Sequence, residues 1–454
     1  MKIDSIKQQY SMPNFRAGKV RVFSDFDKTF SPATHNDFAR QMDKCFVDAI
    51  RENFKSFKDF LANTRDGLKF TITTGRTFGE FQKMAEIARE RKFGMPLPDT
   101  LIVKNGSDEH IRTGSDEAFY NGGEFPFKYD VTNKEKEENI KKLTGWDGKK
   151  IRDMLIKLFK SYDIKKIVEA DSEHSVGDYG SRSLFSQGKL PYEVGKEFIA
   201  PDKADWSVGL RRDGNLKIYA LKPYDEYDVE ERKLAFKDIS QKLETQMSQE
   251  GIKWMHRNDD NGVVHGRKPM GYCPYIIDKF GGHQELTKVY DVNEAVKEAI
   301  KNNDLVIAAG DSSNDKVMLD PTRFFLENLP EEIKAKYPYE KAVHLYFEGK
   351  SALRFINKHP DLAEAYRKIP FVGVIVRQND GTNKLSSLEE FAKGENKKII
   401  IVNEGELQKG IKEAVKLYCK QNPEYAKKLN PDLKKEIKMT DDKPCGGGGC
   451  PPRK

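Results

Sequence analysis

The chain has 454 residues, too many for one ordinary hydrophobic core, so we expect two domains. Charged residues make up 33% and hydrophobic residues 37%, and the 79 basic and 72 acidic residues leave a net charge of only +7. The basic residues are interspersed with acidic ones, which disfavours a nucleic-acid-binding protein. No run of about 18 apolar residues is present, which disfavours a membrane-spanning protein.

The cysteines and the N-terminal residues indicate in which cellular compartment the protein is expected. The five cysteines do not suggest a disulfide framework. The segment MKIDSIKQQYSMPNF lacks the apolar centre of a secretory signal. We therefore expect a cytoplasmic protein. Cys445 and Cys450 lie in the sequence CGGGGCPPRK, which we interpret as a flexible terminus with incidental thiols rather than a metal site.

The first 110 residues alternate between strand and helix patterns. Strands are expected at 19–24, 68–76 and 99–107, and helices at about 36–63 and 78–94, the second helix with Gly94 as its C-cap. Strands that alternate with helices at this spacing predict a parallel sheet in an α/β domain.

From about residue 110 the pattern changes to that of a separate α+β unit. Residues 108–148 are polar, and a helix is expected at 151–162. Two alternating runs flank Asp213-Gly214, which predicts a hairpin, and a further helix is expected at about 229–249.

The first pattern returns with DLVIAAGDSSND at 304–315, followed by strands at 371–376 and 397–402 and a helix at about 405–420. The simplest organisation is one α/β core in two halves, separated by an inserted domain. We place the first half at 15–110, the inserted α+β domain at 111–264, the second half at 265–425 and a flexible tail at 426–454. Residues 325–368 are expected to be an insertion that forms a lid or a partner surface.

Polar residues follow the predicted core strands. In a parallel sheet ligands collect at the carboxyl ends of strands, so these residues should converge on one crevice. Clustered carboxylates repel one another unless a cation lies among them, and oxygen-only ligands suit Mg²⁺. An ionised aspartate beside Mg²⁺ can attack phosphorus, and a second aspartate can shuttle the proton. The residues concerned are Asp25, Asp27 and Thr29, then Thr74-Gly75-Arg76, Asn105-Gly106, and Gly310-Asp311 through Asn314-Asp315.

The segments SDFDKT, ITTGRT and AAGDSSNDKVML resemble, in that order, the three signature motifs of the haloacid dehalogenase superfamily. With its large insertion and the segment LPDTLIVKNGSDE at 97–109, the chain is similar to capped (type IIB) members, the sucrose-phosphate phosphatase-like and Cof-like sugar phosphatases. The likeness covers about 15–110 and 265–420. It implies a Rossmann-like α/β core with a parallel sheet and an inserted α+β cap domain.

The resemblance also implies a role for each motif residue. Asp25 would be the nucleophile and Asp27 the general acid and base, while Thr29 would order the first loop. The Mg²⁺ ligands would be Asp25, Asp27 through its backbone carbonyl, and Asp311, with Asn314 and Asp315 supporting the metal or its waters. The phosphate and substrate contacts would be Thr74, Gly75, Arg76 and Asn105.

The family also has a catalytic lysine at the start of the helix before the last motif. Lys268 opens GRKPMGYCPYIIDKFGG, whose apolar spacing and closing glycines resemble that helix, and 283–303 would then be an insertion. Lys288 lies at a more usual distance from Asp311. We prefer Lys268 because its local pattern fits better. Lys28 is a further departure, because many members have glycine there.

The predicted function is Mg²⁺-dependent hydrolysis of a small phosphorylated metabolite, preferably a sugar phosphate, through an aspartyl-phosphate. The expected partner is this small-molecule ester, with no nucleic acid and no membrane. Two alternatives stay open, a sugar phosphomutase and a catalytically silent binding protein on the same fold. The sequence names neither the ester nor the oligomeric state.

Overall fold

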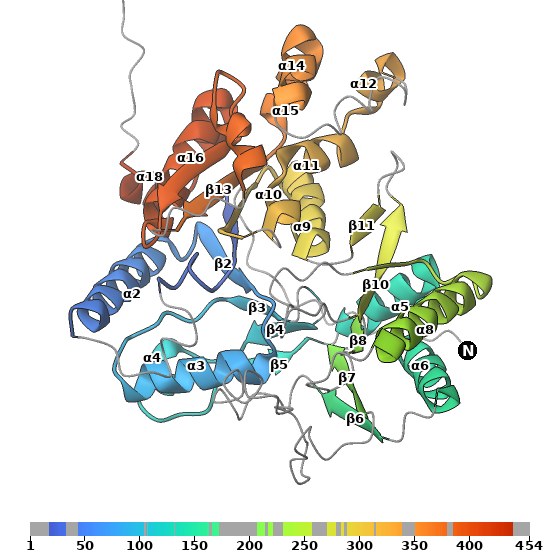
Figure 1. Ribbon diagram of the computed structural model, residues 1–454. Coiled ribbons are helices and arrows are strands. Elements are labelled where there is room, and N and C mark those ends of the chain that lie inside the picture. The colour runs from blue at the N-terminus through green and yellow to red at the C-terminus, as the bar shows by residue number, and fades with distance from the viewer. Residues whose placement is uncertain are drawn as a thin grey trace, which may run out of the picture.

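The computed structural model (Figure 1) describes residues 18–32, 44–103, 106, 108–130, 132–162, 166–171, 207–213, 217–220, 230–256, 270–277, 283–285, 288–312, 315–337, 350–378 and 385–438. Four residues to which the sequence drew attention lie outside this part of the chain. They are Lys268, Asn105, Asn314 and Cys450, the last together with the rest of the cysteine-containing terminus.

An eight-stranded sheet forms the core, in the order β14-β13-β12-β1-β2-β3-β4-β5. Its strands are β1 (Val20–Ser24), β2 (Leu68–Thr73), β3 (Thr100–Val103), β4 (Asp108–Arg112), β5 (Phe127–Tyr129), β12 (Leu305–Gly310), β13 (Phe371–Arg377) and β14 (Ile399–Asn403). The strands from β14 to β3 run parallel, and β4 and β5 are antiparallel. The predicted α/β fold with a mainly parallel sheet is confirmed.

Helices cover both faces of this sheet because its central strands are apolar on both sides. In β12, Leu305 and Ile307 belong to one hydrophobic cluster and Val306 and Ala308 to the other. The first cluster includes residues of α2 (Lys44–Thr64), α3 (Phe78–Glu90), α4 (Asp116–Tyr120), α16 (Leu407–Gln421), α17 (Pro423–Lys428) and α18 (Pro431–Glu436). The second includes residues of α9 (Lys288–Asn302), α10 (Lys316–Leu319), α11 (Pro321–Glu327), α12 (Glu331–Lys336), α14 (Lys350–Lys358), α15 (Pro360–Lys368) and the 3₁₀ helix η5 (Ser386–Ala392).

A second sheet of six strands forms the inserted unit, which lies on the right in Figure 1. It comprises β6 (Lys166–Asp171), β7 (Ser207–Asp213), β8 (Lys217–Ala220), β9 (Trp254–His256), β10 (Met270–Ile277) and β11 (His283–Glu285). Its helices are α5 (Thr132–Thr144), α6 (Gly148–Ser161) and α8 (Glu230–Gln249). Trp146, Leu155, Leu243 and Tyr272 belong to a hydrophobic core of its own. The hairpin predicted at Asp213 is present as the antiparallel pair β7–β8.

The inserted unit begins and ends later than the expected boundaries of 111 and 264. β4 and β5 pair antiparallel beyond β3 and so extend the core sheet to Tyr129. β10 and β11 belong to the second sheet, and the core resumes with α9. The polarity of residues 108–148 misled the sequence interpretation, because β4 and β5 lie at an edge of the core sheet, where polar side chains are common.

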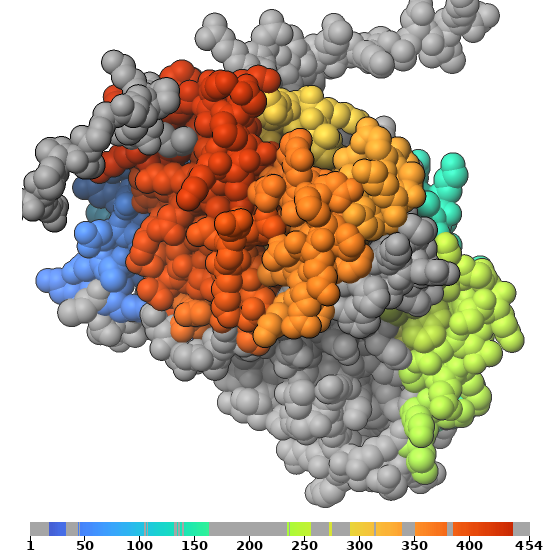
Figure 2. All heavy atoms as spheres, turned by 90° about the horizontal axis from the view of Figure 1, so that it is seen from above, coloured from blue at the N-terminus to red at the C-terminus, as the bar shows by residue number. Residues whose placement is uncertain are grey.

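Two segments that were expected to lie outside the core are part of it. The described residues 325–337 and 350–368 are not an insertion but belong to helices between β12 and β13, with Ile356 and Tyr366 buried on the second face. Residues 426–438 are not a flexible tail, because Leu429 and Leu433 are buried on the first face. There α18 packs beside α2, as the adjoining red and blue atoms in Figure 2 show.

Helix α3 begins where its sequence predicts but ends earlier. The Thr77 side chain accepts from the Glu80 backbone N–H, and the Glu80 carboxylate accepts from that of Thr77, which completes a capping box. The helix ends at Glu90, and Lys92 follows in the left-handed conformation at φ 57°. Gly94, also left-handed, is therefore not the C-cap that the sequence suggested.

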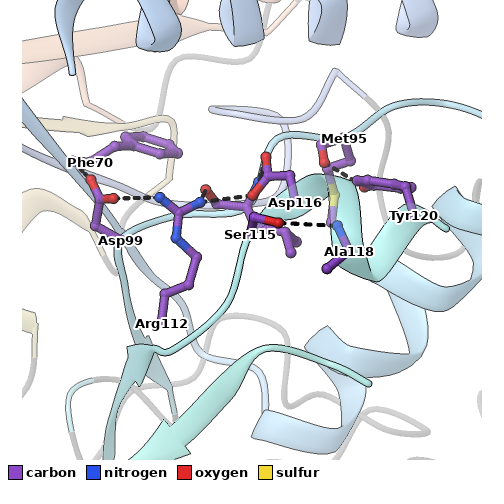
Figure 3. A network of polar contacts seen from close by, with 9 residues as sticks. Phe70, Met95, Asp99, Arg112, Ser115, Asp116, Ala118 and Tyr120 are labelled. Atoms are coloured by element: carbon purple, nitrogen blue, oxygen red, sulfur yellow. Dashed lines mark hydrogen bonds and ion pairs between the residues drawn. The ribbon is translucent and has the colours of Figure 1, made fainter. Parts of the chain in front are cut away.

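Charged residues at the amino ends of the strands are paired in compact networks. In Figure 3, Arg112 lies 2.6 Å from Asp99 and 2.8 Å from Asp116, and it donates to the Leu97 carbonyl at 2.9 Å. Asp99, directly before β3, also accepts from the Phe70 N–H at 2.9 Å. This network ties the end of β4 to β2 and to the start of β3.

Two further charged residues, Lys398 and Asp304, lie directly before strands. Lys398, before β14, is only 1% exposed and donates to the carbonyls of Arg367 at 2.9 Å and Ile369 at 2.8 Å. Burial lowers the pKa of Lys398 well below its ordinary value. Asp304, before β12, accepts from Arg21 at 3.3 Å, and burial raises the pKa of Asp304.

Candidate active site

The register of the central strands brings the predicted motif residues to one edge of the sheet. Ser24, the last residue of β1, pairs with Ile72 of β2 and Ala309 of β12. The residues that follow these strands therefore lie side by side. The Asp25 N–H donates to the Ala309 carbonyl at 2.9 Å, which continues the ladder by one residue beyond β1. The convergence expected from the sequence is present for the described residues.

The loop after β1 is held in place by two phenylalanines. Phe26 and Phe30 are 0% and 2% exposed, and the Phe30 ring lies 5.2 Å from that of Phe57 and 5.2 Å from that of Phe70, centre to centre. Their burial anchors a turn in which the Phe30 N–H donates to the Asp25 carbonyl at 3.3 Å. The apolar anchors therefore hold the acidic residues between them at the sheet edge, where a flexible loop would not.

Three aspartates form a buried acidic cluster. Asp25, Asp311 and Asp315 each offer a carboxylate oxygen, and these oxygens lie within 4.8 Å of one another. All three residues are less than 9% exposed. Buried carboxylates this close repel strongly unless a cation lies among them. An all-oxygen donor set of this charge fits a hard divalent cation such as Mg²⁺.

The loop after β12 is shaped by Asp315. Its Oδ2 accepts from the backbone N–H groups of Asp311 and Ser312, both at 3.2 Å, and from the Ser312 hydroxyl at 3.0 Å. Asp315 comes so close to Gly310 that a Cβ there would lie 2.4 Å from the Asp315 Cβ. Glycine at 310 is thus required for the closed loop that presents Asp311.

Arg76 holds Asp27 in a bidentate ion pair. Arg76 Nε donates to Asp27 Oδ2 at 2.8 Å, and Nη2 donates to Oδ1 at 2.7 Å. The pair joins the loop after β1 to the turn after β2, where the Thr74 hydroxyl accepts from the Arg76 N–H at 3.3 Å. The resemblance implied a substrate contact for Arg76. In the structure it orients the second aspartate.

Asp311 is held from two sides. Thr29 Oγ1 donates to Asp311 Oδ1 at 3.0 Å, so Thr29 joins the first loop to the last motif. Gln378 Nε2, directly after β13, donates to Asp311 Oδ2. Lys28 Nζ in turn donates to Gln378 Oε1 at 2.9 Å. Lys28 has φ 59°, a left-handed conformation that costs a non-glycine residue about 1–2 kcal/mol.

The prediction of a helix after Lys268 is wrong. Met270–Ile277, within GRKPMGYCPYIIDKFGG, is strand β10 of the inserted unit, where Tyr272 pairs with Ile218. Residues 283–303 are not an insertion either, because α9 leads into β12 and packs against it. Lys288 is the first residue of that helix. The β-branched and aromatic residues of the stretch outweighed its helix-like spacing.

Gly106 lies between β3 and β4, which pair antiparallel. Val103 pairs with Asp108, and Gly106 takes the left-handed φ of 95° and donates to the Val103 carbonyl at 3.1 Å. Gly106 is therefore part of a turn. A substrate contact by Asn105 stays a prediction.

Gln378 is the site residue that sequence reasoning missed. The strand that ends beside it was predicted, and polar residues after the other strands were taken as candidates. The same rule applied to the strand predicted at 371–376 would have found it. Thr74 and Gly75 lie at the end of β2 as predicted, with Thr74 buried and Gly75 exposed.

No protein-family model matches the chain, and no curated protein gives a significant match. Among solved structures, the chain is similar to a sucrose-phosphatase from Synechocystis in complex with sucrose and phosphate (TM-score 0.37, 12% identity, 88% of this chain and 98% of that chain covered). It is also similar to a haloacid dehalogenase-like hydrolase from Bacteroides thetaiotaomicron (0.36, 10%, 88% and 98%) and to the C-terminal domain of a C. albicans trehalose-6-phosphate phosphatase (0.33, 11%, 89% and 92%). At these scores the likeness carries no functional argument, so the function has to be inferred from the site residues. In the described part of the chain, no helix is long and apolar enough to cross a membrane.

Proposed function

We propose that the protein is a metal-dependent phosphatase of the haloacid dehalogenase superfamily that acts on a small phosphorylated metabolite. The observation that carries this proposal is the buried cluster of Asp25, Asp311 and Asp315 at the carboxyl edge of a parallel sheet. Three clustered carboxylates are costly to fold without a cation, and a fold keeps such a cluster when the cluster has a function.

Asp25 is the proposed nucleophile. One of its carboxylate oxygens attacks the phosphorus of the ester, the bond from phosphorus to the leaving oxygen breaks, and an aspartyl-phosphate forms. The buried position of Asp25, 6% exposed, limits competition from bulk water in this step. The backbone of Asp25 is fixed by the Ala309 carbonyl and by the turn to Phe30. The nucleophile is therefore held in place before the substrate arrives.

Asp27 is the proposed proton donor for the leaving oxygen and the base for the water that hydrolyses the aspartyl-phosphate. Both its oxygens accept from Arg76. A protonated oxygen is a weaker acceptor than a carboxylate oxygen, so proton uptake by Asp27 weakens one of the two Arg76 hydrogen bonds. Arg76 thus orients Asp27 before the reaction begins.

A divalent cation such as Mg²⁺, held by Asp25, Asp311 and Asp315 when bound, would neutralise charge on the transferring phosphoryl group. We assign the third-motif lysine to Lys288 instead of Lys268, because Lys288 opens the helix that leads into β12. Thr74 and Gly75 follow β2, which pairs with β1, and they are the proposed phosphate contacts. The inserted unit is the proposed cap that selects the substrate.

The test is phosphate release by the purified protein with and without Mg²⁺, on p-nitrophenyl phosphate and a panel of sugar phosphates. Asp25→Asn is the matched control, because it keeps the size of the side chain and removes the nucleophilic charge. Metal-dependent release that disappears in Asp25→Asn is the expected result, and the ranking of the panel identifies the substrate class. No release from any ester by folded, Mg²⁺-bound protein would contradict the proposal.

The same assay separates the alternatives that share this fold. A phosphomutase needs a bisphosphate activator and conserves total ester phosphate, whereas a phosphatase releases inorganic phosphate. A silent binding protein binds the ester without either outcome.

A further inference from the structure

We infer that Lys28 and Gln378 form a positioning relay that orients the Asp311 carboxylate for cation binding. The relay rests on the proposed metal-dependent function, and it assigns a role to two residues outside the catalytic set. Lys28 lies in the loop after β1, and Gln378 lies directly after β13.

The hydrogen-bonding chemistry of the relay allows one direction only. The Lys28 ammonium can only donate, and the ionised Asp311 carboxylate can only accept. The side-chain amide of Gln378 lies between them, accepts from Lys28 Nζ at 2.9 Å through Oε1 and donates to Asp311 Oδ2 through Nε2. Lys28 thus fixes the orientation of the Gln378 amide. A flipped amide would place its NH₂ group against the Lys28 ammonium and its oxygen against the Asp311 carboxylate.

The relay completes the support of Asp311. Thr29 donates to Oδ1 at 3.0 Å, and Gln378 donates to Oδ2. With one donor on each oxygen, the plane of the carboxylate is defined before a cation binds. Partners that orient a metal ligand in this way affect metal affinity by about 10- to 100-fold when they are removed.

The backbone of Lys28 supports a role for its side chain. Its φ of 59° is a conformation in which glycine is strongly favoured and a lysine is strained. Lysine at a left-handed position of the first motif indicates that the side chain contributes something that glycine could not. The contact to Gln378 is a contribution of this kind.

The experiment measures Mg²⁺ binding to the full chain by calorimetry, with magnesium chloride alone and no substrate. Lys28→Met removes the donor and one positive charge. If Lys28 acted only as a nearby cation, its loss would tighten Mg²⁺ binding, because repulsion would be relieved. The relay predicts the opposite sign, a dissociation constant about three- to tenfold higher. Lys28→Arg keeps the charge and the donor and is expected to stay close to wild type.

Gln378→Leu tests the second link of the relay and is expected to raise the Mg²⁺ dissociation constant about tenfold. In the double variant Lys28→Met/Gln378→Leu, the added effect of Lys28→Met should disappear, because Lys28 acts through Gln378. Lys92→Met is the matched control. Lys92 is an exposed lysine with φ 57°. It follows the carboxyl end of α3, whereas the turn after β2 precedes the amino end of that helix, so its replacement should leave Mg²⁺ binding unchanged.

The outcomes distinguish the relay from the proposed function. Wild-type protein that binds no Mg²⁺ overturns the proposed metal site and the relay with it. Wild-type protein that binds Mg²⁺, with equal or tighter binding in Lys28→Met, overturns the relay alone. The relay is also overturned by variants that change the KM for an ester substrate and leave Mg²⁺ binding unchanged, because Lys28 would then contact the substrate directly.

Discussion

The two ends of the parallel strands handle buried charge in opposite ways. At the amino ends, the buried Asp304 and Lys398 and the partly exposed Asp99 each precede a strand and meet an opposite charge or carbonyl groups. At the carboxyl ends, Asp25 and Asp311 each follow a strand and lie within 4.8 Å of like charge.

The contrast teaches how to separate structural charges from functional ones in this fold. A buried charge that is matched by its neighbours stabilises one packing arrangement. A group of like charges costs folding free energy, so its persistence indicates a ligand that offsets the repulsion. The same core therefore has a structural edge and a proposed reactive edge.

The largest expected effect comes from the carboxyl edge. Asp25→Asn should lower phosphate release at least about 1000-fold, because it removes the proposed nucleophile. In EDTA, the same change should raise the free energy of unfolding by about 1 kcal/mol, because it relieves repulsion among the carboxylates. Urea denaturation without metal measures the second effect. A loss of stability alongside the loss of activity would mean that Asp25 is a structural charge.

Gly310→Ala should affect activity and stability together. The added Cβ would lie 2.4 Å from the Asp315 Cβ, so the loop that presents Asp311 must shift. Activity should fall about 100-fold, as expected for a misplaced catalytic group, and stability by about 1–3 kcal/mol. Steady-state kinetics measures the activity, and urea denaturation of the same preparation measures the free energy of unfolding. Wild-type activity in Gly310→Ala would show that the close approach of Asp315 is not needed.

At the amino edge, Arg112→Met should lower stability and leave activity unchanged. The change leaves Asp99 and Asp116 without their cationic partner. Because both carboxylates are partly exposed, the free energy of unfolding should fall by only about 2 kcal/mol. Lys427→Met, which breaks the exposed pair with Glu424, is the control and should change stability by less than about 0.5 kcal/mol. Equal effects of the two variants in urea denaturation would argue against the network shown in Figure 3.

The smallest effect is a change in pH dependence. Burial lowers the pKa of Lys398, so between that lowered value and 10.5 the unfolded chain binds more protons than the folded one. The free energy of unfolding should therefore rise with pH in this interval, by at most about 1.4 kcal/mol per pH unit. Lys398→Met should flatten this rise relative to wild type. Parallel pH profiles for the two proteins in urea denaturation would contradict the assignment.

Much of the core could be predicted from the sequence because its signals are local. The strands at 19–24 and 371–376 and the helix at about 405–420 lie within a few residues of β1, β13 and α16. Long apolar runs and regular spacing depend only on residues that are close in the sequence, so the elements they predict can be recognised without knowledge of the fold.

The failures occurred where distant contacts outweigh local pattern. The stretch after Lys268 has apolar spacing that resembles a helix, but pairing with β8 and β9 makes it a strand. Residues 426–438 look like a polar terminus, yet burial of Leu433 under α2 makes them part of the core. Propensity is a weak guide when such pairing or burial is available.

The sequence by itself determined which residue types follow the strands, and hence that Asp25, Asp27, Thr74 and Asp311 lie at one edge of the sheet. This was possible because parallel strands present their carboxyl ends together. Only the tertiary structure decided how these groups are held. Arg76 forms an ion pair with Asp27, Asp315 accepts from the backbone of its own loop, and Gln378 bridges Lys28 and Asp311. These contacts join residues up to 350 positions apart in the chain, and their partners depend on sheet order and register, which no local pattern encodes.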